Sequence, residues 1–176
     1  MFDYDVKIRN SGNIQGAAWS SIGGIKNTTT RLFGNPSTMV INSGEITLAE
    51  NARIHKGAKI SNTGVIRIGP RSYINPNALL VINKSLEIGS DCAISWNVSI
   101  MDNDLHKILP ENPESDTGIY IGDRVWIGSD VKILKNARIG SGSVIAANSV
   151  VNSEIPERCL AAGIPAKVIR TNVNWN

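Results

Sequence analysis

The sequence predicts an all-β fold: a triangular solenoid of parallel strands built from six-residue repeats. From residue 121 onward an aliphatic side chain returns at every sixth position, and no helix has that period. The positions one and four residues after each aliphatic keep the same phase and are mostly small or aliphatic. A third observation is a twenty-residue period in the preceding part of the chain. In such a fold the aliphatic side chains stack in columns down the axis, and glycines and small residues occupy the corners.

The elements follow in order along the chain. Residues 1–39 are irregular, with loop-like runs at 23–24 and 28–30, and a partial first coil is left open for them. Coils are expected over residues 40–100, where each coil contains three six-residue units and two extra residues that form a wider corner, at 62–63 and again at 82–83. The repeated aliphatics of this part are Leu48, Ile54, Ile60, Ile68, Ile74, Leu80, Ile88, Ile94 and Ile100.

The repeat then stops over residues 101–118, a polar stretch with two prolines, which we interpret as a loop inserted into the solenoid. It resumes over residues 119–155, and residues 156–176 form a C-terminal tail. The aliphatics of this second part are Ile121, Ile127, Ile133, Ile139, Ile145 and Val151. An antiparallel sandwich of short strands would also be rich in glycine and β-branched residues, but it predicts no fixed period.

Composition limits the possible functions. A chain of 176 residues with 41% apolar content suits one domain, and 18 basic against 15 acidic residues give a net charge too small to indicate a nucleic-acid partner. Cys92 and Cys159 are far apart and predict neither a disulfide framework nor a thiolate metal site. Residues 1–5 carry acids where a signal peptide would be basic, and no apolar run could span a bilayer. We therefore expect a cytoplasmic protein with no membrane insertion.

Two segments carry a family resemblance, IGDRVWIGS at 121–129 and AAGIPAKVIR at 161–170. With the repeats over 48–170, they resemble the hexapeptide-repeat acyltransferases, especially the branch with galactoside, maltose and chloramphenicol acetyltransferases. The resemblance implies a left-handed parallel β-helix, an exception to the right-handed crossover rule. It also implies acetyl-CoA as co-substrate, no metal, and a homotrimer with sites between subunits. The segment 93–106 is similar to members that O-acetylate surface polysaccharides or sugar precursors, so the expected acceptor is a small molecule or a glycan.

His106 in the inserted loop is the candidate catalytic residue. Acetyl transfer to a hydroxyl needs a group that removes its proton, and neutral imidazole has a suitable pKa. The resembled enzymes carry a general-base histidine in the corresponding loop. Asp102 and Asp104 are candidates for orienting the ring or binding the acceptor. The alternatives are that a backbone carbonyl orients the ring and that the two acids are merely solvated. His55 is expected to be an exposed residue without a catalytic role.

The remaining site residues follow from the resemblance. Ser129 or its N–H would lie near the thioester carbonyl, where a donor stabilises developing negative charge. Asn77 and Trp96 are expected on the acceptor side, with a turn-forming asparagine and a subunit-interface tryptophan as the alternatives. Trp126 has the same interface alternative, and Lys167 and Arg170 suit coenzyme phosphates or are ordinary solvated basic residues. The predicted coenzyme contacts are Trp126, Ser129, Ala147, Asn152, Ser153, Lys167 and Arg170.

Other functions fit less well. A γ-type carbonic anhydrase gathers three histidines around zinc, and this chain has two. A non-catalytic solenoid needs a regular outer face, whereas the outward positions here vary. N-acetylation of an amino sugar or of a serine-type acceptor remains open, because a histidine base serves those reactions too. Neither cysteine lies in the loop, so direct transfer without an acyl-enzyme is expected.

Overall fold

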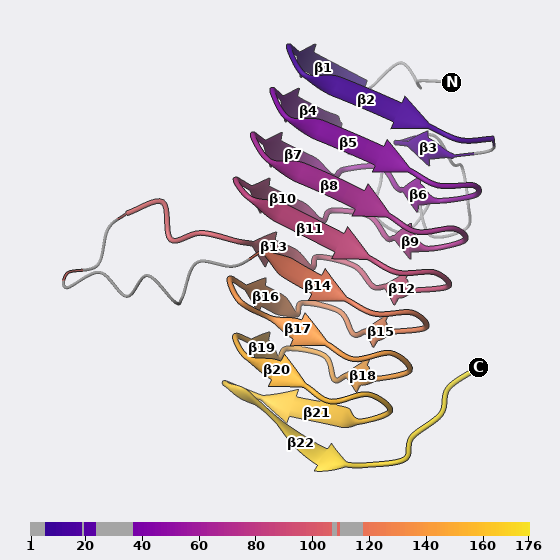
Figure 1. Ribbon diagram of the computed structural model, residues 1–176, viewed down its shortest axis with the longest axis vertical. Helices are drawn as coiled ribbons and strands as arrows, with labels where there is room; N and C mark the ends of the chain where they lie inside the picture. The colour runs from indigo at the N-terminus through magenta and orange to yellow at the C-terminus, as the bar shows by residue number, and fades with distance from the viewer. Residues whose placement is uncertain (1–5, 19, 24–36, 107–108, 110–117) are drawn as a thin grey trace.

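The computed structural model describes residues 6–18, 20–23, 37–106, 109 and 118–176, and these form a solenoid with three long sheets (Figure 1). Sheet A contains, in spatial order, β1 (Val6–Asn10), β4 (Thr38–Asn42), β7 (Lys59–Asn62), β10 (Leu79–Ile82), β13 (Ser99–Met101), β16 (Lys132–Leu134) and β19 (Val150–Val151). Sheet B contains β2 (Asn13–Gly16), β5 (Glu45–Leu48), β8 (Val65–Ile68), β11 (Ser85–Ile88), β14 (Ile119–Ile121), β17 (Arg138–Ile139) and β20 (Glu154–Ile155). Sheet C contains β3 (Ser21–Ile22), β6 (Arg53–Ile54), β9 (Tyr73–Ile74), β12 (Ala93–Ile94), β15 (Trp126–Ile127), β18 (Val144–Ile145), β21 (Leu160–Gly163) and β22 (Ala166–Arg170).

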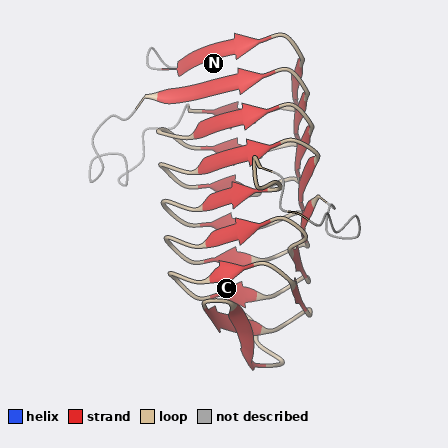
Figure 2. Ribbon diagram, turned by 90° about the vertical axis from the view of Figure 1, so that its left-hand side faces the viewer, coloured by secondary structure: helices blue, strands red, loops and turns tan. Residues whose placement is uncertain are grey.

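The strand register explains the repeat seen in the sequence. Apart from β22, the strands pair in parallel from one coil to the next, so that Ile54 aligns with Ile74 and Ile74 aligns with Ile94. Because alternate side chains of a strand point to opposite faces, each such column stays inside the solenoid over its whole length. The aligned isoleucines are fully buried, and Figure 2 shows the strands stacked in register along the axis. The predicted core columns are therefore confirmed.

We name the three edges of the solenoid the A–B, B–C and C–A corners, after the sheets that they join. At the A–B corner, asparagines form a ladder in which the buried Asn62 donates to the buried Asn42 (2.7 Å) and Asn42 donates to the exposed Asn10 (2.7 Å). The twenty-residue period continues this column through Ile82 to Asp102. The chain turns just after Asn62 and Ile82, at the wider corners that the sequence predicts.

Both ends of the described chain take part in the sheets. Residues 6–22 supply the first strand of each sheet, and β22 turns back antiparallel to β21 at the far end. The last residues then run back along the B–C corner, where Val173 N donates to Arg158 O (2.9 Å) and Trp175 Nε1 donates to Arg124 O (2.8 Å). None of the described residues belongs to a helix that is long and apolar enough to cross a membrane.

Candidate active site

The solenoid is interrupted at the A–B corner between β13 and β14, where the chain leaves the stack after Asp102 (Figure 1). His106 belongs to the departing segment, and its side chain is exposed. Residues 107–108 and 110–117 of the predicted loop lie outside the described residues. The chain therefore presents its candidate base beside an interrupted corner of the solenoid.

Asp102 lies at the start of this segment and is fully buried. Its carboxylate accepts three backbone N–H groups of the preceding coil, from Asn83 (2.8 Å), Lys84 (2.7 Å) and Ser85 (3.0 Å). One coil earlier, the equivalent groups Thr63 N and Val65 N donate instead to backbone carbonyls. Asp102 thus replaces backbone acceptors that are missing where the chain departs. This arrangement favours a structural role over the expected ring-orienting or acceptor-binding role.

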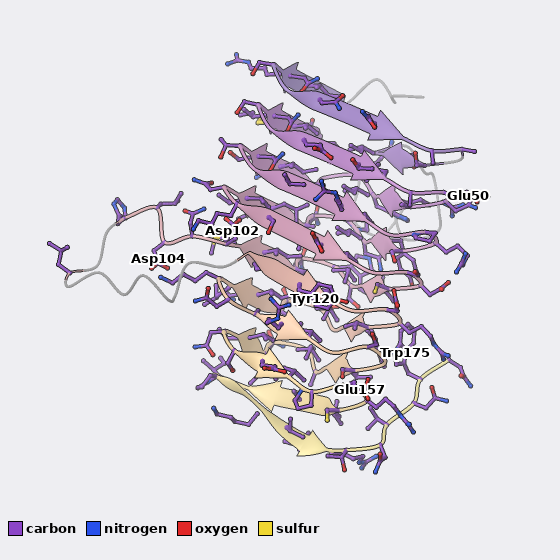
Figure 3. The ribbon with its side chains drawn as sticks, in the orientation of Figure 1. Glu50, Asp102, Asp104, Tyr120, Glu157 and Trp175 are labelled. Atoms are coloured by element: carbon purple, nitrogen blue, oxygen red, sulfur yellow. The ribbon has the colours of Figure 1, made fainter. Side chains whose placement is uncertain are left out.

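Asp104 lies farther along the departing segment (Figure 3) and forms an ion pair with Lys135. Lys135 follows β16, one coil beyond the loop, at the same A–B corner. Between the two acids, Asn103 accepts the N–H of Leu105 (2.8 Å) and donates to Asp102 (3.1 Å). Asp104 is therefore linked to the solenoid through its carboxylate.

A second group of predicted residues gathers at the C–A corner. Asp130 N donates to Trp96 O (3.0 Å) and Asn148 N donates to Ser129 O (2.9 Å), so Trp96, Ser129 and Ala147 stack in one column. A side chain at Gly128 would meet the backbone N of Ala147 at 2.6 Å, so glycine permits this close approach of the coils. The expected coenzyme residues Ser129 and Ala147 thus lie side by side.

Asn77 lies at the same corner two coils before Ser129. Its φ is +66°, in the left-handed region that asparagine tolerates, and Asn97, Asp130 and Asn148 repeat this conformation at the equivalent positions. Its backbone N–H donates to Lys56 O (3.2 Å). Asn77 is therefore a turn residue, as one of the two alternatives predicts. The turn does not prevent its side-chain amide from contacting the acceptor, and that contact stays a prediction.

Trp126 lies on the outward face of sheet C, with 43% of its surface exposed. Its Nε1 donates to Ser95 Oγ (3.4 Å), and its ring centroid lies 6.1 Å from that of Trp175. Arg124 also donates to Asn174 Oδ1 (3.4 Å), which holds the terminal segment against this face. Sequence reasoning missed Trp175, because nothing in the repeat indicates where the terminal residues run.

The other expected coenzyme contacts are exposed and lie at separate places. Asn152 and Ser153 form the A–B corner two coils beyond the loop. Lys167 and Arg170 are on β22, where Lys167 pairs with Ala162 near the C–A corner and Arg170 pairs with Leu160 near the B–C corner. Within one chain, the residues at the A–B corner and those at the C–A corner lie along opposite edges of sheet A.

His55 is buried, which corrects the expectation that it is exposed. Its ring packs against Tyr73 of the next coil, with the centroids 6.3 Å apart. Burial, and secondarily the charge of Arg53, lowers the pKa of His55. Its position in the packed coil separates it from His106 at the interrupted corner.

The cysteines offer no activated nucleophile. Cys92 Sγ donates to the buried carbonyl of Gly122 (3.0 Å), and burial raises the pKa of this thiol. Cys159 is also buried. Within the described ranges, no group of three or more His, Cys, Asp or Glu side chains is arranged to hold a metal ion.

Comparison with known proteins identifies relatives of the chain. Residues 118–153 match the family model described as bacterial transferase hexapeptide (six repeats). The chain is 39% identical over 127 residues to galactoside O-acetyltransferase of Escherichia coli K12, covering 70% of this chain and 63% of the relative. It is 32% identical over 143 residues to the putative lipopolysaccharide biosynthesis O-acetyl transferase WbbJ of the same organism, covering 73% of each. The chain thus spans less than two thirds of the first relative and more of the second.

A solved structure supports the same relationship. The structure of galactoside acetyltransferase in complex with coenzyme A is 28% identical, with a TM-score of 0.58, over 93% of this chain and 66% of that one. The predicted fold, a left-handed parallel β-helix, is confirmed. The six-residue period, the three parallel sheets and these similarities agree, and the chain belongs to the hexapeptide-repeat acyltransferase family.

Proposed function

We propose that the protein is an acetyl-CoA-dependent O-acetyltransferase that acts on a sugar or on a precursor of a surface polysaccharide. The named relatives support the reaction, since one is a galactoside O-acetyltransferase and another is a putative lipopolysaccharide O-acetyl transferase. A related acetyltransferase structure contains coenzyme A, which supports the co-substrate. Because acetyl-CoA is abundant in the cytoplasm, we expect the reaction to take place there.

One observation carries this proposal. The His106 segment leaves one edge of sheet A, while Trp96, Ser129 and Ala147 line its other edge in the same and following coils. A single chain therefore separates the candidate base from Trp96, Ser129 and Ala147 by the width of sheet A. Three copies with sheet A toward a common axis would bring the A–B corner of each copy against the C–A corner of the next. The proposed site is then shared between subunits of a homotrimer.

The outward face of sheet A suits such a contact. Met39, Ile41 and Leu79 are large apolar side chains with at least a third of their surface exposed on this face. In the register, Ile41 aligns with Ser61, and the same column continues to Val81 and Met101. Lys59 lies between Met39 and Leu79 in the neighbouring column, so the face is mixed, and its exposed apolar side chains favour a contact surface. Sheet B instead exposes charged pairs such as Arg67 with Glu45 (3.2 Å).

In the proposed mechanism, the imidazole of His106 accepts the proton of the acceptor hydroxyl as its oxygen attacks the thioester carbonyl. Ser129 would donate a hydrogen bond to the carbonyl oxygen while negative charge develops there. The carbon–sulfur bond then breaks, and the imidazolium returns the proton to the departing thiolate. The buried cysteines favour this direct transfer over an acyl-enzyme.

The test measures thiol release from acetyl-CoA with a panel of sugars, nucleotide sugars, amino sugars and serine. We expect release that depends on a sugar hydroxyl and falls at least a hundredfold in His106→Ala. His55→Gln is the matched control, because it removes the other histidine and should retain activity. Undiminished turnover by His106→Ala would refute the base, and release only with amine acceptors would favour N-acetylation. Sedimentation of a fully active monomer would refute the shared site.

A further inference from the structure

The segment that carries His106 begins with an unusually constrained turn. Asp102 is fully buried and accepts three backbone N–H groups, which anchors the first residue of the turn in the solenoid. Asn103 bridges this anchor to Leu105 by accepting its N–H and donating to Asp102. Asp102, Asn103 and Leu105, three of the four residues before His106, are therefore held by hydrogen bonds made by two side chains.

Leu105 adopts a conformation that its own side chain disfavours. Its φ is +60°, in the left-handed region that costs a residue with a Cβ and that only Gly, Asn and Asp visit routinely. The side chain is 67% exposed, so packing does not explain the conformation. An unfavourable conformation next to a candidate catalytic residue is found where the surroundings force it. In this turn the constraint comes from Asn103 on one side and Asp104 on the other.

The constraint on Asp104 comes from a different coil. Its carboxylate pairs with Lys135, which follows β16 in the coil beyond the loop. Both side chains are only partly exposed, so solvent screens the pair less than a fully exposed one. The turn 102–105 is thus attached to the coil before it through Asp102 and to the coil after it through Asp104. His106 is the next residue.

We propose that Lys135 is a positioning residue for His106. By holding Asp104 it keeps the turn 102–105 in one conformation and fixes the direction in which the imidazole is presented. This inference rests on the proposed function, in which His106 is the general base. Misplacing a catalytic group by about 1 Å can reduce the rate by about a hundredfold. Loss of Lys135 should therefore lower kcat while leaving the KM for acetyl-CoA unchanged.

The test compares Lys135→Met with Arg138→Met, which removes an exposed basic side chain of the same coil on sheet B, away from the proposed contact face. We expect kcat to fall about ten- to hundredfold in Lys135→Met, with an unchanged KM for acetyl-CoA. Lys135→Arg, which can still pair with Asp104, should retain most of the activity. Arg138→Met should behave as the wild type. Equal kcat values for Lys135→Met and the wild type, where His106→Ala is inactive, would overturn the proposal.

A readout that does not use activity separates this proposal from the proposed function. The chain has two histidines, so NMR of ring-labelled histidine gives one signal for His106 and an internal reference from buried His55. In Lys135→Met the His106 signal should sharpen and shift as the ring gains mobility, while the His55 signal stays unchanged. An unchanged His106 signal would overturn the proposal whatever the enzyme assay shows. Activity retained in His106→Ala, together with a changed signal in Lys135→Met, would leave the restraint in place and refute the catalytic base alone.

Discussion

Replacing Asp102 tests whether one carboxylate substitutes for missing backbone acceptors. Asp102→Ala leaves three backbone N–H groups, those of residues 83–85, without their acceptor at a partly buried corner. Each such loss costs about 1–2 kcal/mol after some rehydration, so the free energy of unfolding should fall by about 3–6 kcal/mol. Asp102→Asn keeps one acceptor oxygen and places an NH₂ against a donor, so we expect a loss of about 1.5–3 kcal/mol.

The assay is urea unfolding of wild type and variants at one protein concentration, because association would make the midpoint depend on concentration. Asp123→Ala is the matched control: Asp123 accepts a single backbone N–H, from Ser90 (2.7 Å), at the exposed B–C corner. That substitution should cost about 0.5–1.5 kcal/mol. If the free energy of unfolding of Asp102→Ala lay within about 1 kcal/mol of the wild-type value, water would be accepting the hydrogen bonds of the three N–H groups, and the argument would be refuted.

Three further predictions follow from burial and backbone conformation. Because the pKa of His55 is lowered in the folded protein, the unfolded chain binds more protons just below pH 6.5. The contribution of neutral His55 to the free energy of unfolding is therefore complete above about pH 6.5 and is lost as the pH falls. The decrease in Tm from pH 7.5 to 5.5 should be smaller in His55→Gln. Asn77→Gly keeps the φ of +66° accessible and removes the amide, so Tm should change little; a raised KM for the acceptor would identify an acceptor contact, and unchanged kinetics would leave Asn77 as a turn residue only. Ile94→Ala in the buried column of sheet C should lower the unfolding free energy by about 2–5 kcal/mol in urea unfolding, and a cost below 1 kcal/mol would contradict its place in the core.

The fold was predictable because it repeats the same local rule in every coil. The inward columns, such as Ile54, Ile74 and Ile94, were readable from the period alone, since a slip of one residue would expose a whole column to solvent. The A–B corner was readable for the same reason. The hand of the coil was not, because the period is the same for either hand, and it followed from the family resemblance.

The candidate site was only partly predictable. The loop and the exposure of His106 followed from the break in the repeat, but the contacts of Asp102 and Lys135 depend on which backbone groups lose their partners when the chain departs. The sequence nevertheless contained a signal for the burial of Asp102. This residue falls twenty residues after Ile82, in the corner column that contains the buried Asn42 and Asn62. The burial of His55 had no such signal, because the repeat predicts the direction of a side chain and not what packs over it.

The structure also explains why a long insertion is tolerated at this place. β13 still pairs with β16, and β11 still pairs with β14, so sheets A and B continue across the interruption. Only the hydrogen bonds of the corner itself are lost, and the carboxylate of Asp102 replaces them. Under the proposal above, the direction of the His106 imidazole depends on Asp102 and Lys135, because the anchored turn precedes it directly. A solenoid that carries a candidate base on an inserted segment then places it through the first residues of that segment, which remain bonded to the coils on both sides.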